Sequence, residues 1–210
     1  MVTRKFQVII MMFIMCITAS RDAWADVNLW HDKWDVLADQ PGVEITTGQN
    51  TNGDETRDIL LPGKVSIHET RHDDKIERVE QDISGHGAVM CVWGIYTALR
   101  SVFDLCPTNS GDEELKTALD DAINRIDDFI LANSNAGVTK EGLQAQVRKQ
   151  MLAAQEKLNG LPDDVRAQKC YAGDAAKMLD RLRSKPTDSI KRSVDDLLSV
   201  PRPPVINPCL

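Results

Sequence analysis

Two histidines and a glutamate stand together in the stretch HETRH, residues 68–72. In an α-helix, histidines four residues apart lie one turn above each other, so both imidazole rings can reach one metal ion at about 2.0 to 2.1 Å. A glutamate next to the first histidine lies close to the metal-bound water and can accept its proton. The spacing therefore predicts a zinc site with His68 and His72 as ligands and Glu69 as the catalytic general base.

A helix over residues 64–83 would place this motif on its apolar side. At about 100° per residue, the motif residues share an arc of about 100° with the aliphatic side chains of the segment, which are Val65, Ile76, Val79 and Ile83. Glutamate is rarely buried without a partner. A zinc ion with its bound water would give Glu69 that partner.

A catalytic zinc ion needs a third protein ligand, and the sequence offers two candidates. His86 stands in the glycine-containing break SGHG and can reach the site if the preceding helix ends early. Asp104 would lie opposite Ile67 if residues 64–105 form an antiparallel pair of helices that turns near residue 85. We prefer His86 as the third zinc ligand, and the alternative is that His86 caps the second helix.

The elements expected around this site are one hairpin and a series of helices. Residues 42–48 and 56–63 flank the strong turn formers Asn52, Gly53 and Asp54, a pattern typical of a β-hairpin. The chain after Pro62 is expected to be helical. The predicted helices cover about 64–83, 88–105, 113–130 after a capping box at 110–113, 140–158, 163–184 and 187–199. A proline-rich tail follows them, and we expect Cys209 to pin it.

Residues 27–38, VNLWHDKWDVLA, carry a further amphipathic pattern ahead of the hairpin. Leu29, Trp30, Trp34 and Leu37 recur at helical spacing, and QPG ends the segment soon afterwards. The pattern predicts a short helix that docks on the rest of the protein. His31 lies beside the apolar stripe and is interpreted as a packing or surface histidine.

The beginning of the chain has the layout of a secretory signal peptide. Arg4 and Lys5 precede an apolar run over residues 6–17, and a small-residue triplet ends at Ala25. The run is about a dozen residues, short of the roughly 20 that cross a bilayer. We therefore expect cleavage after Ala25 and a periplasmic or secreted protein with no membrane contact, and an uncleaved anchor is the alternative.

Charge and cysteines limit the function classes and the fold. Residues 26–210 contain 31 acidic and 22 basic residues, a net charge of −9, which argues against nucleic acid as a partner. Four cysteines in this part suggest two disulfides. Cys91 and Cys106 would lie about 22 Å apart on one helix, beyond the limit of about 7 Å for a disulfide. Each therefore pairs with Cys170 or Cys209, in an order left open.

The order of hairpin, HETRH helix and further helices resembles the zincin group of zinc metallopeptidases. The chain is also similar to bacterial metallopeptidase domains in which the motif is followed by a helix with acidic and tryptophan positions, as in residues 79–93, VEQDISGHGAVMCVW. The resemblance covers roughly residues 43–105. It implies zinc as cofactor, His68 and His72 as ligands, Glu69 as general base, and a peptide or protein substrate.

These observations predict a mainly α fold with a small β-hairpin, an α+β protein with a minimal zincin-like core and a disulfide-linked helical C-terminal half. After the signal peptide at 1–25, the hairpin and HExxH region would cover 26–107, and the helical region 108–210 would belong to the same domain. The predicted function is an exported zinc-dependent hydrolase, a metallopeptidase. The alternative is a non-enzymatic periplasmic binding protein of the inhibitor or toxin-immunity type, or an inactive metallopeptidase-like module; the oligomeric state stays open.

Overall fold

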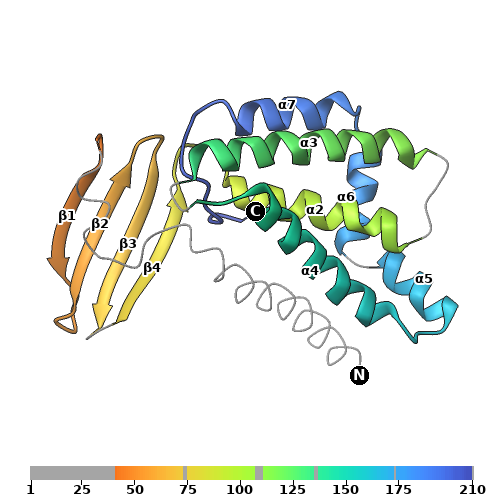
Figure 1. Ribbon diagram of the computed structural model, residues 1–210, viewed down its shortest axis with the longest axis horizontal. Coiled ribbons are helices and arrows are strands. Elements are labelled where there is room, and N and C mark those ends of the chain that lie inside the picture. Colours follow the sequence, from red (N-terminus) through yellow and green to blue (C-terminus); the bar gives the residue numbers. More distant parts are fainter. Residues whose placement is uncertain (1–40, 73–74, 107–110, 135–136, 173, 210) are drawn as a thin grey trace, which may run out of the picture.

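The structure is a computed structural model of the 210-residue chain, and it describes residues 41–72, 75–106, 111–134, 137–172 and 174–209. Within these ranges, a four-stranded antiparallel sheet lies beside six helices (Figure 1). This architecture confirms the predicted α+β class. The predicted signal peptide and the predicted helix at 27–38 lie outside the described residues.

The sheet is a simple meander in the order β1-β2-β3-β4. Its strands are β1 (Glu44–Gln49), β2 (Glu55–Leu61), β3 (Val65–His72) and β4 (Lys75–Asp82). The side-chain oxygen of Asn50 accepts hydrogen bonds from the backbone N–H groups of Asn52 and Asp54, and Gly53 has a φ of 87° in the same turn. These local bonds form the turn between β1 and β2, and the predicted hairpin is confirmed.

The prediction of a helix over residues 64–83 is wrong, because β3 and β4 occupy this part of the chain. Burial alternates along β3: Val65, Ile67 and Glu69 are buried, whereas His68 between them is exposed. Short apolar patterns are compatible with both a helical arc and a two-residue alternation. Pairing with β2 on one side and β4 on the other decides the outcome here, since it satisfies the backbone of β3 on both sides.

The helical part agrees closely with the sequence pattern. Its helices are α2 (Val89–Leu105), α3 (Asp112–Asn133), α4 (Lys140–Leu158), α5 (Asp163–Ala172), α6 (Asp174–Arg183) and α7 (Asp188–Leu197). Thr139 caps α4, because its hydroxyl accepts a hydrogen bond from the N–H of Gly142. The one clear difference is that the helix predicted over 163–184 forms two helices, α5 and α6.

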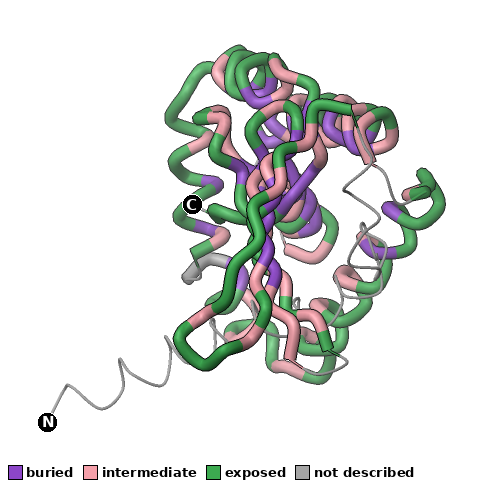
Figure 2. Tube along the Cα trace, turned by 90° about the vertical axis from the view of Figure 1, so that its left-hand side faces the viewer, coloured by how far each residue is buried: buried purple, intermediate pink, exposed green. Residues whose placement is uncertain are grey.

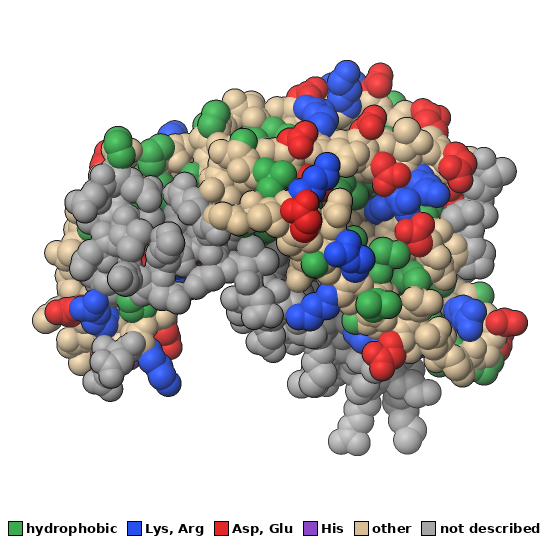
Figure 3. All heavy atoms as spheres, in the orientation of Figure 1, with side chains coloured by type: hydrophobic (Ala, Val, Ile, Leu, Met, Phe, Trp, Pro, Cys, Tyr) green, Lys and Arg blue, Asp and Glu red, His purple; other side chains and the backbone are tan. Residues whose placement is uncertain are grey.

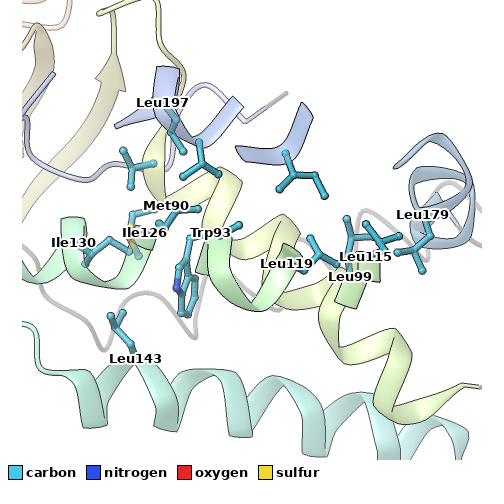
Figure 4. Packing of buried hydrophobic residues seen from close by; sticks show 14 of the residues in the cluster. Met90, Trp93, Leu99, Leu115, Leu119, Ile126, Ile130, Leu143, Leu179 and Leu197 are labelled. Atoms are coloured by element: carbon cyan, nitrogen blue, oxygen red, sulfur yellow. The ribbon is translucent and has the colours of Figure 1, made fainter. Parts of the chain in front are cut away.

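One large apolar core holds the helices together, and Trp93 of α2 is fully buried in it. Figure 4 shows side chains from α2, α3, α4, α6 and α7 directed into this core. Leu119, Ile126 and Ile130 recur at helical spacing along α3 and are completely buried. The amphipathic stripe of α3 therefore faces the other helices, as its sequence predicts.

Two disulfides join the early and late parts of the chain. Cys91 pairs with Cys209, and Cys106 pairs with Cys170. The structure thus confirms that Cys91 and Cys106 do not pair with each other, and it decides the order that the sequence leaves open. The bond to Cys209 also confirms that the tail is pinned.

The C-terminal tail joins the sheet to the helices through Arg202, whose side chain is fully buried. Its guanidinium donates to the carboxylate of Asp82 at the end of β4, at 2.5 Å, and to the backbone carbonyl groups of Gly87, Leu197 and Val200. A Cβ atom on Gly63 would lie 2.4 Å from the Cβ of Arg202, so only glycine permits this approach. The described residues include no helix of the length and apolarity that a membrane crossing requires.

Candidate functional site

The strand places the three residues of the predicted zinc site on opposite faces of the sheet. His68 and His72 lie on one face and Glu69 lies on the other, because side chains alternate along a strand. The two histidines are four positions apart along β3, which corresponds to about 13 Å. That is too far for both imidazoles to bind one ion, so this geometry does not support a shared zinc ion.

Each histidine of the motif has a carboxylate neighbour instead. Nδ1 of His68 lies 2.7 Å from Oδ1 of Asp58 on β2, and Nδ1 of His72 lies 3.0 Å from Oδ1 of Asp54. Nε2 of His72 lies 3.8 Å from Oε2 of Glu77 on β4. These pairs are about half exposed, so solvent screens them and each adds little to stability.

The structure does not bring either candidate third ligand to the motif. His86 lies in the turn between β4 and α2, where its Nδ1 is 3.1 Å from Oδ1 of Asp196 on α7. Asp104 accepts a hydrogen bond from Arg100 one turn earlier on α2. The prediction that Asp104 lies opposite Ile67 is wrong, because the neighbours of Ile67 are Ile59 and Glu80 on adjacent strands.

No group of three histidine, cysteine, aspartate or glutamate residues within the described ranges is arranged to hold a metal ion. The zinc site and the general-base role of Glu69 therefore stay predictions, without support from the positions of these side chains.

Glu69 is fully buried, as predicted, and its partners are two arginines on the neighbouring strands. Oε2 accepts from Nε and Nη2 of Arg57 at 2.9 and 2.7 Å. Oε1 accepts from Nε of Arg78 at 2.9 Å and lies 2.7 Å from its Nη2. The strand register sets Arg57, Glu69 and Arg78 side by side, so the network follows directly from the pairing of β2, β3 and β4.

This network explains why a glutamate occurs among the aliphatic residues of the motif. Both carboxylate oxygens are engaged by guanidinium groups, and the side chain has no exposed surface. Charge-assisted contacts of this kind compensate for the loss of hydration. Glu69 therefore connects β2, β3 and β4 through its contacts with the two arginines, and its carboxylate is not accessible to a substrate.

The sequence interpretation missed Arg57, Arg78, Asp82 and Arg202 as charged residues that pair inside the fold; Arg78 is partly buried and the other three are buried. A local signal exists for the first two, since each occupies a position that alternates with exposed residues in its strand. The partner of each arginine depends on the register between strands, which no short pattern encodes. The buried pair of Asp82 and Arg202 joins residues 120 positions apart, and no local signal identifies it.

The face of the sheet that carries the histidines is a broad polar surface, which we call the outer face. Its members alternate with the buried positions and are mostly exposed, and they include Glu44, Thr46, Thr56, Asp58, Leu60, Ser66, His68, Thr70, His72, Lys75, Glu77, Val79 and Gln81. Val79 is 59% exposed, the most exposed large aliphatic residue that the structure describes within the sheet. Strand β1, nearest the viewer in Figure 2, forms an edge of this face and is almost entirely exposed.

A hollow lies where the start of α3 meets the connection between α6 and α7. It has a volume of about 700 Å³ and polar walls. Arg183 makes two hydrogen bonds to the buried carboxylate of Asp112 there, and these bonds raise the pKa of the guanidinium above its ordinary value. Thr187 donates to Glu114 across the same hollow. Its polar groups are thus largely paired with one another.

Comparisons of the chain with protein-family models, with curated protein sequences and with solved structures found no match. The fold and the outer face therefore define the class of the protein by themselves: a disulfide-linked α+β protein with an open, polar sheet face.

Proposed function

We propose that this chain is a non-enzymatic binding protein of the cell envelope that binds a basic protein through the outer face of its sheet. The observation that carries the proposal is the open, acidic character of that face. Asp58 and Glu77 are 63% and 76% exposed, and Val79 lies exposed next to His68 in the strand register. Exposed carboxylates around an apolar side chain resemble the mixed composition of transient protein interfaces.

The distribution of charge supports a basic partner. Residues 41–87, which contain the sheet, carry ten acidic and five basic residues, whereas residues 88–210 carry seventeen acidic and sixteen basic residues. The acidic excess of these two parts thus belongs mostly to the sheet. On the side of the helical part that Figure 3 shows, acidic and basic side chains are interspersed, in keeping with its nearly balanced charge. Such a difference steers a basic partner toward the sheet and speeds its association.

The shape of the sheet supports a protein as the partner. Neighbouring strands pair along their length and form one continuous four-stranded surface. The buried network of Glu69 lies directly behind this surface and holds β2, β3 and β4 in register. A preorganised surface loses little conformational entropy when it binds.

The two disulfides support the location of the protein in an oxidising compartment. Both bonds link distant parts of the chain and fit a periplasmic or secreted protein. An inhibitor or an immunity protein against a secreted toxin would act there by covering a basic surface of its target. Such a role needs a rigid, charged binding face rather than a catalytic group.

A capture experiment with two matched variants tests the proposal. The double variant Asp58→Lys/Glu77→Lys reverses two exposed charges on the outer face. The control, Glu156→Lys/Asp164→Lys, makes the same charge change at exposed positions of α4 and α5. Purified protein should capture one stoichiometric partner from an envelope extract. We expect the sheet variant to weaken binding at least about tenfold, since loss of close charge pairs costs more than 1.4 kcal/mol.

The control variant should retain the affinity of the wild type, and added salt should weaken binding by the wild type. Equal loss in both variants would mean that only net charge matters and would contradict a site on the outer face. Metal analysis of the same preparation provides a second check. About one zinc ion per chain that His68→Ala removes would support the zinc-hydrolase prediction instead.

A further inference from the structure

The two edges of the sheet differ in how they are protected against pairing with a further strand. At the edge formed by β4, the N–H of Asp82 donates to the carbonyl of Asn207 in the C-terminal tail. Along the same strand, KIERVEQD, five of the eight residues are charged, and charged side chains are a usual protection of an edge strand. The β4 edge is therefore closed at its end and protected by charge along its length.

The edge formed by β1 lacks these protections. Among the residues that the structure describes, β1 pairs with β2 alone, and its six residues form one continuous register with β2. The strand, EITTGQ, contains a single charged residue and no proline, and every residue except the half-buried Ile45 is exposed (Figure 2). Its isoleucine and two threonines favour an extended backbone. An exposed, regular and nearly uncharged edge of this kind is able to pair with another strand.

A hydrogen bond in the turn between β1 and β2 shows which backbone groups face the open edge. The N–H of Asn50 donates to the carbonyl of Asp54 at 3.0 Å, which identifies this pair as hydrogen-bonded. In an antiparallel pair of strands, hydrogen-bonded pairs recur at every second residue. The register therefore turns the N–H and C=O groups of Ile45, Thr47 and Gln49 away from β2. These groups form a row of donors and acceptors that matches the backbone of a further strand.

The outer face beside β1 determines which side chains such a strand should carry. Asp58 of β2 lies opposite Thr46 on this face and is 63% exposed. Neighbouring strands are about 4.8 Å apart, so a strand added beside β1 would lie about 10 Å from β2. Gly48 has no side chain and leaves room for a long side chain to cross β1. A lysine or arginine can thus reach the Asp58 carboxylate, whereas an acidic residue would be repelled by Asp58 and Glu44.

We propose that the partner adds an extended segment as a fifth strand at the β1 edge, with lysine or arginine side chains that cross the outer face toward Asp58. This inference rests on the proposed function and names the form of its basic partner. Backbone hydrogen bonds to β1 supply affinity in such a complex, and alternate side chains supply specificity. A second copy of the chain is a poor source of the strand, because residues 41–87 carry ten acidic and five basic residues and two such sheets repel each other.

A synthetic peptide tests the inference on the purified protein. The probe is a capped peptide of four Lys-Val repeats, and its matched control replaces each lysine by glutamate. Amide hydrogen exchange, followed by NMR, reports which backbone groups the peptide engages. We expect saturating lysine peptide to slow exchange several-fold at Ile45, Thr47 and Gln49. Exchange at Thr46 and Gly48, whose N–H groups already face β2, should change little, and the glutamate peptide should have no effect.

A pair of variants at Thr47 tests the backbone contact separately. Thr47→Pro removes the central N–H of the open edge without removing a hydrogen bond to β2, and proline is tolerated in edge strands at such positions. The matched variant Thr47→Ala removes the side chain and keeps the N–H. We expect Thr47→Pro to weaken binding of the lysine peptide by about tenfold and Thr47→Ala to retain the affinity of the wild type. Circular dichroism and urea denaturation of both variants check that the sheet is folded.

Several outcomes contradict the inference. Equal slowing at Thr46 and Thr47, equal binding of the two peptides, or full affinity in a folded Thr47→Pro variant would each overturn it. Slow exchange at Ile45, Thr47 and Gln49 without peptide would show that the edge is already occupied, by a second copy if dilution restores fast exchange, and would overturn it as well.

The partner captured from the envelope extract separates this inference from the proposed function. If Asp58→Lys/Glu77→Lys loses that partner and Thr47→Pro retains it, the outer face is the binding site but no strand is added, so the inference alone fails. If both variants retain the partner, the proposed function itself fails. Loss of the partner in both variants, with retention in Thr47→Ala, is the result that we expect.

Discussion

The helical part buries fifteen hydrophobic residues in one cluster, whereas the cluster of the sheet contains five, one of them Val205 from the tail, among the residues that the structure describes. The sheet instead buries charge, with Glu69 between Arg57 and Arg78 and with Asp82 against Arg202. The helices thus gain stability from apolar burial, which is non-directional. The sheet depends on contacts that require specific geometry.

This difference bears on how each part specifies its structure. A slip of one residue between strands would turn every buried side chain of β3 to the outer face. It would also separate the Glu69 carboxylate from both guanidinium groups, because each contact depends on the present register. The network of Arg57, Glu69 and Arg78 therefore favours one strand alignment, and it does so more strictly than five apolar residues would. In the helices, the amphipathic stripes alone select the buried faces.

The largest effect that tests this comparison is expected for Glu69→Ala. The change leaves two guanidinium groups without the carboxylate that they share, and breaking a buried ion pair in this way costs about 3 to 5 kcal/mol. The free energy of unfolding, measured by urea denaturation, should fall by that amount. Glu77→Ala on the outer face is the control and should change it by less than about 0.5 kcal/mol. A loss in Glu69→Ala no greater than in the control would show that the network does not hold the sheet.

The next effect concerns the tail that connects the two parts. Replacing Cys91 and Cys209 together by serine removes a bond that closes a separation of 118 residues, and such a loss typically costs about 2 to 4 kcal/mol. We expect faster hydrogen exchange at the end of β4 and the start of α2, where the tail accepts hydrogen bonds from Asp82 and Met90.

The matched control replaces Cys106, which follows the end of α2, and Cys170, which lies on α5. Its increase in exchange should be confined to the helical part. If the control accelerates exchange in β4 as strongly as the first variant, the tail is not the specific connection between sheet and helices.

The smallest effect concerns Asp127, one of the buried carboxylates of the helical part. Its burial raises the pKa of the carboxyl group above the ordinary value, although the Trp93 indole N–H donates to it at 2.5 Å and favours the charged form. Between the ordinary and the raised pKa, the folded state binds more protons than the unfolded state. The free energy of unfolding therefore falls as pH rises through this window.

Asp127→Asn keeps an oxygen that can accept from Trp93 and removes the titration. We expect this variant to unfold at a higher temperature than the wild type at neutral pH, with the difference shrinking as pH falls toward the ordinary aspartate pKa. Asp128→Asn, one residue along α3 and exposed, controls for the change in net charge. An identical pH profile for the two variants would contradict a cost of burying Asp127.

The motif HETRH shows which properties of a site can be predicted from the sequence. The burial of Glu69 follows from its aliphatic neighbours in either a helix or a strand, and the structure confirms it. The helical interpretation failed because Val65, Glu69 and His72 fit one helical arc, while Val65, Ile67 and Glu69 fit a strand alternation equally well. Only the second pattern finds partners on both sides, and those partners lie in other segments.

The sequence by itself determined the hairpin, most helix boundaries, the exclusion of a bond between Cys91 and Cys106, and the anchoring of the tail. These features depend on turn formers, caps, apolar spacing and chain geometry, which act within a few residues or through simple distance limits. The tertiary structure alone decided that residues 65–72 and 75–82 form strands and that the partners of Glu69 and Asp82 are arginines. Those outcomes depend on register and on contacts between distant segments, where many pairings are locally compatible and only the assembled fold selects one.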